Sequence, residues 1–186
     1  ILNDDTGIRI ADAQVLEGNT GDTSVMQFTV TRSGDLSHES SAHWTRSNGT
    51  TSSASFASGP TSGDITFAVG ATTATIEVDV AGNNAIQADK TFAITLSALS
   101  GISINSGNDL VAAGTILNDD TAFTITAGTP VLEGDGMGQE FTITRSTLTA
   151  QSQTVDWTVA GTGPFAANLA DFVASTGSVT FGEGEY

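Results

Sequence analysis

Two short acidic motifs of this chain carry the residue types that bind cations. Glu17 lies in a Glu-Gly pair that returns at Glu133, and the Asn-Asp-Asp that ends residues 1–5 returns as Asn118-Asp119-Asp120. Carboxylate oxygens are hard ligands, and Ca²⁺ takes about 6–8 oxygens from carboxylates, backbone carbonyls and water. Carboxylates that crowd together repel one another, and a divalent ion removes that penalty. These residues are therefore candidate calcium ligands, provided that the fold brings them together.

The same recurrence divides the chain into repeats. Residues 1–5 and 116–120 have identical sequences, so the period is 116 − 1 = 115 residues, which is the length of a small domain. Other segments recur at similar offsets: residues 28–33 as 141–146, and 63–67 as 177–181. We therefore expect residues 1–5 to close a preceding repeat, residues 6–120 to form a complete module, and residues 121–186 to begin a second, truncated module.

The composition excludes several classes of function. With 21 acidic and 5 basic residues and a formal net charge of −16, the chain cannot build the basic surface that nucleic acid or an anionic membrane requires. It contains no cysteine, which excludes disulfides, thiolate zinc sites and thiol catalysis. No apolar run approaches the roughly 20 residues that span a bilayer, so we expect no membrane insertion.

Apolar and polar residues alternate in several short segments, as they do in half-buried β-strands. Met26, Phe28 and Val30 point to one face of such a strand, and the polar residues between them point to the other. Six further segments bring the number of strands to about seven: 8–13, 42–46, 65–67, 75–80, 92–96 and 111–117. This pattern predicts an all-β fold, a two-sheet antiparallel sandwich. We expect four aromatic residues in the cores: Trp44, Trp157, Phe56 and Phe172.

Strand direction assigns the loops to the two ends of this sandwich. If successive strands alternate in direction, residues 15–22, 47–61 and 81–89 lie at the same end as the exit from the last strand. Glu17 and Asp119, which are 119 − 17 = 102 residues apart, should then converge there together with Asp120. We call this end the acidic pole. It would suit calcium; the alternative is that Asn-Asp-Asp merely ends the strand and turns the chain.

Five motifs, in this order, resemble those of the Calx-β domain. They are Glu17-Gly18, Asn48-Gly49-Thr50, residues 63–67, Thr91-Phe92 and residues 116–120. The resemblance covers essentially all 186 residues, in two registers. The family is known from sodium–calcium exchangers, from integrin β4 and from large bacterial surface proteins. The resemblance implies tandem immunoglobulin-like sandwiches, with calcium bound at the acidic pole in those members that keep the ligands.

The first repeat departs from the calcium-binding pattern that the resemblance implies. Calcium-binding members carry Asp before an aromatic residue, where this repeat has Ser55 before Phe56. Their acidic residues between the fifth and sixth strands look replaced by Asn, Gln and Lys in residues 82–90. The remaining metal candidates are Glu17, Asp119 and Asp120, with Asp89 as a fourth. So few ligands, with Lys90 nearby, make a poor calcium cage.

The second repeat keeps more of that pattern. Glu133 is present, and Asp171 restores the acidic residue before an aromatic, so we expect calcium here more than in the first repeat. This repeat also lacks its last three strands. We therefore expect much of its core to be exposed, and the repeat to be disordered unless another chain supplies strands.

Catalysis is not indicated. A Ser-His-Asp arrangement needs a nucleophile and a base in contact. His38 and His43 are the two histidines, and nothing in their spacing suggests such an arrangement. We therefore expect no enzymatic activity.

These observations favour a structural role. We expect a stalk or filament module of a large, secreted or cell-surface repeat protein, bacterial and related to adhesion or matrix, with calcium stiffening the joints between modules. Its partners would be neighbouring repeats, and self-association into a polymer stays open. One alternative is a calcium-sensing regulatory module. Another is a module that binds a partner protein or a glycan.

Overall fold

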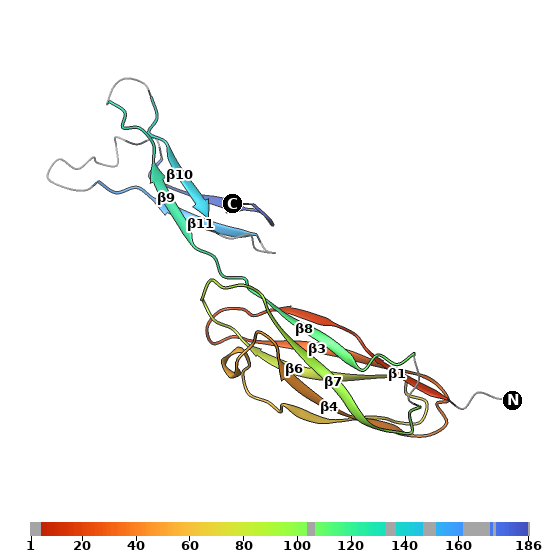
Figure 1. Ribbon diagram of the computed structural model, residues 1–186. Helices are drawn as coiled ribbons and strands as arrows, with labels where there is room; N and C mark the ends of the chain where they lie inside the picture. Colours follow the sequence, from red (N-terminus) through yellow and green to blue (C-terminus); the bar gives the residue numbers. More distant parts are fainter. Residues whose placement is uncertain are drawn as a thin grey trace. The chain divides into compact units, whose positions relative to one another are not determined.

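The alternating segments of the first repeat form the two facing sheets of a β-sandwich (Figure 1). The structure, a computed structural model, describes residues 5–103, 107–132, 137–146, 152–161, 172 and 174–185. The chain divides into two compact units, residues 1–120 and 121–186. In the part that the structure describes, no helix has the length and apolar character of a membrane span.

The first unit has a three-stranded and a five-stranded sheet. The three-stranded sheet has the order β1 (Thr6–Ile10), β3 (Thr23–Gly34), β6 (Thr73–Ala81), and both of its pairings are antiparallel. The five-stranded sheet has the order β2 (Ala13–Leu16), β8 (Val111–Leu117), β7 (Lys90–Ser100), β4 (Ser40–Asn48), β5 (Ser62–Phe67). Its pairings are antiparallel except that of β2 with β8, which is parallel. A single 3₁₀ turn, η1 (Ser53–Ser55), lies between β4 and β5.

The core lies between these sheets and contains the predicted apolar faces. Met26, Phe28 and Val30 of β3 are buried, as are the predicted residues of β5, β6 and β7. Phe28 and Phe92 meet edge to face across the core, with ring centroids 5.8 Å apart. Gly114 of β8 makes room for them, because a Cβ there would lie 2.5 Å from Phe92 Cζ and 2.8 Å from Phe28 Cζ. Trp44 and Phe56 are also buried, as predicted.

The predicted strand over residues 8–13 is wrong as a single element. The chain leaves the three-stranded sheet after Ile10 and joins the five-stranded sheet at Ala13, so β1 and β2 belong to different sheets. Asp12 lies at the crossover, where its Oδ1 accepts the backbone N–H of Ala113 at 2.7 Å. This bond satisfies a backbone donor of β8 at the point where β2 begins.

The second unit repeats the strand pairing of the first. β9 (Phe123–Ala127) pairs with β10 (Phe141–Arg145), and β11 (Gln153–Thr158) pairs with β12 (Thr176–Phe181), both antiparallel. Trp157 lies opposite Gly177, just as Trp44 lies opposite Gly63. Because strands with the same sequence motifs pair in the same register, the two units are copies of one module.

Several apolar side chains that are buried in the first unit are exposed or half-buried in the second, whereas Phe181, the counterpart of Phe67, is buried in both. Phe28 is fully buried, whereas Phe141, its counterpart in the repeat, is 53% exposed. Trp157 and Phe172, both predicted to be core residues, are only half-buried. The prediction that much of the core of the second repeat is exposed is confirmed for the described residues. The expected disorder is not found in them, because β9 to β12 form two regular antiparallel pairs.

Candidate metal centre

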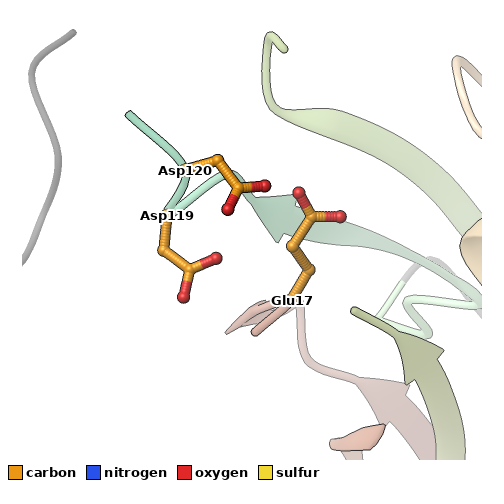
Figure 2. Close-up of side chains that lie close together, drawn as sticks. All are labelled: Glu17, Asp119 and Asp120. Carbon is orange, nitrogen blue, oxygen red and sulfur yellow. The ribbon is translucent and has the colours of Figure 1, made fainter. Parts of the chain in front are cut away.

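Three carboxylates from two distant segments meet at the acidic pole. Glu17, Asp119 and Asp120 each place one carboxylate oxygen within 4.8 Å of the others. Figure 2 shows Asp119 and Asp120 just beyond the end of β8, with Glu17 approaching them from the segment after β2. The convergence of these three residues was predicted from the sequence.

The parallel pairing of β2 with β8 explains this convergence. Leu16 and Leu117 end the two strands side by side in the same direction, so the residues that follow them are also neighbours. The backbone N–H of Glu17 donates to Leu117 O at 3.1 Å, and the backbone N–H of Gly18 donates to Asp119 Oδ1 at 3.2 Å. Alternating strand directions predicted the same meeting, but the parallel pair was not predicted.

Burial and mutual repulsion act on the carboxylates of the pole. Glu17 is only 2% exposed, and this burial raises the pKa of its carboxyl above the ordinary value. Repulsion from Asp120 and Asp119 adds to the rise, whereas a hydrogen bond from Gln87 and the charge of Lys90 oppose it. Burial, followed by repulsion from Asp119, also raises the pKa of Asp120.

Two amide side chains hold the carboxylate of Glu17. Asn83 Nδ2 donates to Oε2 at 2.6 Å, and Gln87 Nε2 donates to Oε1 at 2.7 Å. From the sequence, these two residues were interpreted only as replacements for acidic calcium ligands, and their hydrogen bonds to Glu17 were not predicted. Their position in a loop predicted to lie at the acidic pole, together with their amide chemistry, was the available signal.

The donors at the pole of the first unit do not fit a tightly bound calcium ion. Ca²⁺ requires about 6–8 oxygens, and the described residues bring only three carboxylates together here. Asn83 and Gln87 turn N–H groups toward Glu17, and such groups repel a cation. The assignment of a metal ion to Glu17, Asp119 and Asp120 stays a prediction.

The other candidate ligands have different surroundings. Asp89 is not in the cluster: its Oδ1 accepts the backbone N–H of Asn118 at 2.9 Å. Ser55, at the position of the aspartate in the family pattern, is buried, and its hydroxyl accepts the N–H of Ser52 at 3.2 Å within the turn of η1. Glu133 and Asp171 lie outside the described residues.

One serine, one histidine and one aspartate lie in contact, although the spacing of the histidines did not predict such a contact. Ser37 Oγ lies 2.8 Å from His38 Nδ1 and 3.0 Å from Asp35 Oδ2. These residues belong to one exposed turn, in which the Ser37 N–H donates to Asp35 Oδ1 at 2.9 Å and the His38 side chain is 85% exposed. A catalytic triad needs the acid and the nucleophile on opposite ring nitrogens, whereas here both face Nδ1. The contact is that of an Asx turn.

Comparison with known proteins identifies the family. A family model described as the Calx-beta domain matches residues 3–121 and 117–186, whereas comparison with curated proteins gives no match. The crystal structure of the apo form of the Calx CBD1 domain is 24% identical, with a TM-score of 0.50, over 61% of this chain and 99% of that domain. The crystal structure of calcium binding domain CBD12 of CALX1.1 is 22% identical, with a TM-score of 0.54, over 96% of this chain and 71% of that one. CBD12 from CALX1.2 is also 22% identical, with the same TM-score, over 95% and 72%. At these identities the solved structures support the fold, and the family model, which matches nearly the whole chain in two adjacent segments, shows that the chain belongs to the Calx-beta domain family.

Proposed function

We propose that this chain is a structural segment of a secreted or cell-surface repeat protein, in which consecutive Calx-beta sandwiches form a stalk or filament. The observation that carries this proposal is the repetition of one module with the same strand registers. A protein that needs only length can obtain it by adding copies of one stable unit. Its immediate partners are then its own neighbouring repeats.

The exit from the first unit supports a joint with restricted motion. Between Leu117, which ends β8, and Phe123, which begins β9, the linker has 122 − 118 + 1 = 5 residues and contains neither glycine nor proline. Asn118, the first residue of the linker, is held by two hydrogen bonds. Its backbone N–H donates to Asp89 Oδ1, and its Nδ2 donates to Asp120 O at 2.9 Å. Flexible linkers are instead longer and rich in Gly and Ser.

The net charge of −16 is compatible with a segment of an extracellular protein that contains many such repeats. Like charges along such an array keep neighbouring molecules apart and keep the array soluble. A bacterial surface protein related to adhesion or matrix matches this chemistry. Such a protein would carry its adhesive group on another domain.

Small-angle X-ray scattering of the whole chain tests the structural role. We expect an elongated particle whose maximum dimension is the same in chelator and in calcium. A compact particle in which the two units fold back on each other would contradict a stalk.

A calcium-sensing regulatory module is the second candidate, and the cluster of Glu17, Asp119 and Asp120 favours it. Two of the similar solved structures are tandem CBD12 structures, one of them described as a calcium binding domain. A sensor must bind the ion with different affinity in two conformations. Scattering curves that change between chelator and calcium, with a midpoint in the micromolar range, would favour this candidate over the stalk.

A further inference from the structure

The loop between β6 and β7 (residues 82–89, the β6–β7 loop) has no regular secondary structure, yet it is fastened to the acidic pole. Asn83 and Gln87 together give each carboxylate oxygen of Glu17 one N–H donor. A buried carboxylate without donors is costly, and hydrogen bonds to a charged acceptor are among the strongest that neutral side chains make. These two amides therefore offset part of the cost of burying Glu17.

The amide of Asn83 has one orientation that satisfies both of its ends. While Nδ2 faces Glu17, Oδ1 accepts the backbone N–H of Ala85 at 2.8 Å. A reversed amide would turn its NH₂ group toward the Ala85 N–H and its oxygen toward the Glu17 carboxylate, so both contacts would become repulsive. Asn83 is thus fixed as a donor to Glu17 and does not present an oxygen to a cation.

The β6–β7 loop is also hydrogen-bonded to the segment that follows β2. The Asn83 N–H donates to Gly18 O at 3.0 Å, and the Thr20 N–H donates to Asn84 Oδ1 at 2.8 Å. A Cβ on Gly82 would lie 2.6 Å from Gly18 O, so only glycine permits this approach. The β6–β7 loop is therefore ordered by contacts that the chain itself makes.

We propose that Asn83 and Gln87 form an amide clamp on Glu17, which orders the acidic pole of the first repeat without a metal ion. In this unit the clamp takes the place of a cation that would bridge Glu17 to the β6–β7 loop. The inference does not depend on the stalk, since a calcium-responsive pole would overturn the clamp and leave an elongated particle possible.

Amide hydrogen exchange in the unmodified chain is the first test. Two N–H groups report on the clamp: that of Asn83 is bonded to Gly18 O, and that of Ala85 is bonded to the Asn83 side chain that donates to Glu17. We expect their exchange rates to be the same in excess chelator and in millimolar calcium. Exchange that slows by about tenfold or more in calcium, the effect of roughly one added hydrogen bond to a charged group, would overturn the proposal.

The variant Gln87→Ala tests the clamp by removing one of its two donors to Glu17. Gln87 contacts neither reporting N–H directly, yet its loss should raise the exchange rate of Ala85 by roughly tenfold, equally in chelator and in calcium. Gln27→Ala is the matched control, because Gln27 donates to Glu77 at 2.9 Å in an exposed amide–carboxylate pair on β3 and β6. Unchanged exchange of Ala85 in Gln87→Ala would show that the loop is ordered without the clamp.

The double variant Asn83→Asp, Gln87→Glu converts both donors into carboxylates. Asn83→Asp keeps an oxygen for the Ala85 N–H, but it replaces the donation to Glu17 with a second negative charge. We expect protection of Ala85 to be lost in chelator, through repulsion among the carboxylates, and restored by calcium. If calcium fails to restore it, the claim that the amides stand in place of a cation is wrong.

Discussion

At the scale of single residues, the acidic pole shows how one buried carboxylate is accommodated. Burial and the charges of Asp119 and Asp120 disfavour the ionised form of the Glu17 carboxyl. The hydrogen bonds from two amides and the charge of Lys90 favour it. The meeting of Glu17 with Asp119 and Asp120 could be predicted, because it depends only on strand order and direction. The partnership with Asn83 and Gln87 could not, because it depends on the conformation of a loop without regular structure.

The raised pKa of Glu17 gives its contribution to stability a definite sign. A carboxyl whose pKa is higher in the folded state binds its proton more tightly there than in the unfolded chain. This contribution is fully present below the ordinary value of 4.5 and is lost as the pH rises through the raised pKa. Asp120 acts in the same direction.

We therefore expect the variant Glu17→Gln to flatten the pH dependence of stability. Between about pH 4.5 and neutrality, the unfolding free energy of the first unit should fall less steeply in the variant than in the unmodified chain. Urea unfolding, followed by the NMR signals of β3, measures this slope. Glu77→Gln removes one carboxylate at an exposed position and is the matched control for the change in net charge. A steeper fall in Glu17→Gln would contradict the assignment.

At the scale of elements, an arginine that the sequence analysis missed joins the two sheets. Arg32 of β3 is buried and donates to the backbone carbonyls of His38, Ala68 and Ala71, at distances between 2.7 and 3.0 Å. Its guanidinium lies 5.4 Å from the centroid of the Phe67 ring. Arg145, its counterpart, donates to Gly182 O at 3.0 Å and lies 5.7 Å from the Phe181 ring. The recurrence of Thr-Arg-Ser in both repeats was the signal in the sequence.

Arg32→Lys should destabilise the first unit although the charge is kept. The planar guanidinium of arginine donates to several carbonyls at once, and the compact ammonium of lysine cannot reach them all. Some of the buried carbonyl acceptors therefore lose their donors. We expect a loss of about 2–3 kcal/mol in the unfolding free energy. Denaturation with urea measures it, and Arg9→Lys, at an exposed residue, should cost less than about 0.5 kcal/mol. Equal effects of the two substitutions would contradict a structural role for Arg32.

The strands themselves were largely predictable, and the error over residues 8–13 has a physical explanation. The apolar residues Ile8 and Ile10 occupy even positions, whereas Ala13 and Val15 occupy odd ones. Because side chains alternate between faces with a period of two, a change of phase marks a break in a strand. The break is the crossover at Asp12, where the chain passes from one sheet to the other.

At the scale of the whole molecule, one sequence pattern occurs in two states of burial. Phe28 packs edge to face on Phe92 of β7, whereas Phe141 is 53% exposed. The repeat could be predicted from the sequence, because identical motifs at a fixed period require a common fold. The difference in burial follows from which strands cover each face, and a motif alone does not contain that information.

This difference should appear in the local stability of the two units. Backbone hydrogen bonds under a packed apolar face open rarely, whereas those under an exposed face open often. We expect the strand amides of β10 to exchange at least about a hundredfold faster than those of β3, in chelator and in calcium. Mass spectrometry of the whole chain measures both strands at once. Equal protection would show that the second unit is covered by contacts outside the described residues.

The parallel pair of β2 and β8 has a consequence for a chain under tension. β2 lies near the start of the first unit and β8 at its end, and four residue pairs, from Ala13–Gly114 to Leu16–Leu117, join them in register. Force applied to the two ends of this unit pulls the two strands in opposite directions along their length. All of their hydrogen bonds are then loaded in shear together and cannot open one after another, as they would if the strands were peeled apart. We therefore expect this strand pair to resist a stretching force, and the residues of the acidic pole lie where the chain leaves β8.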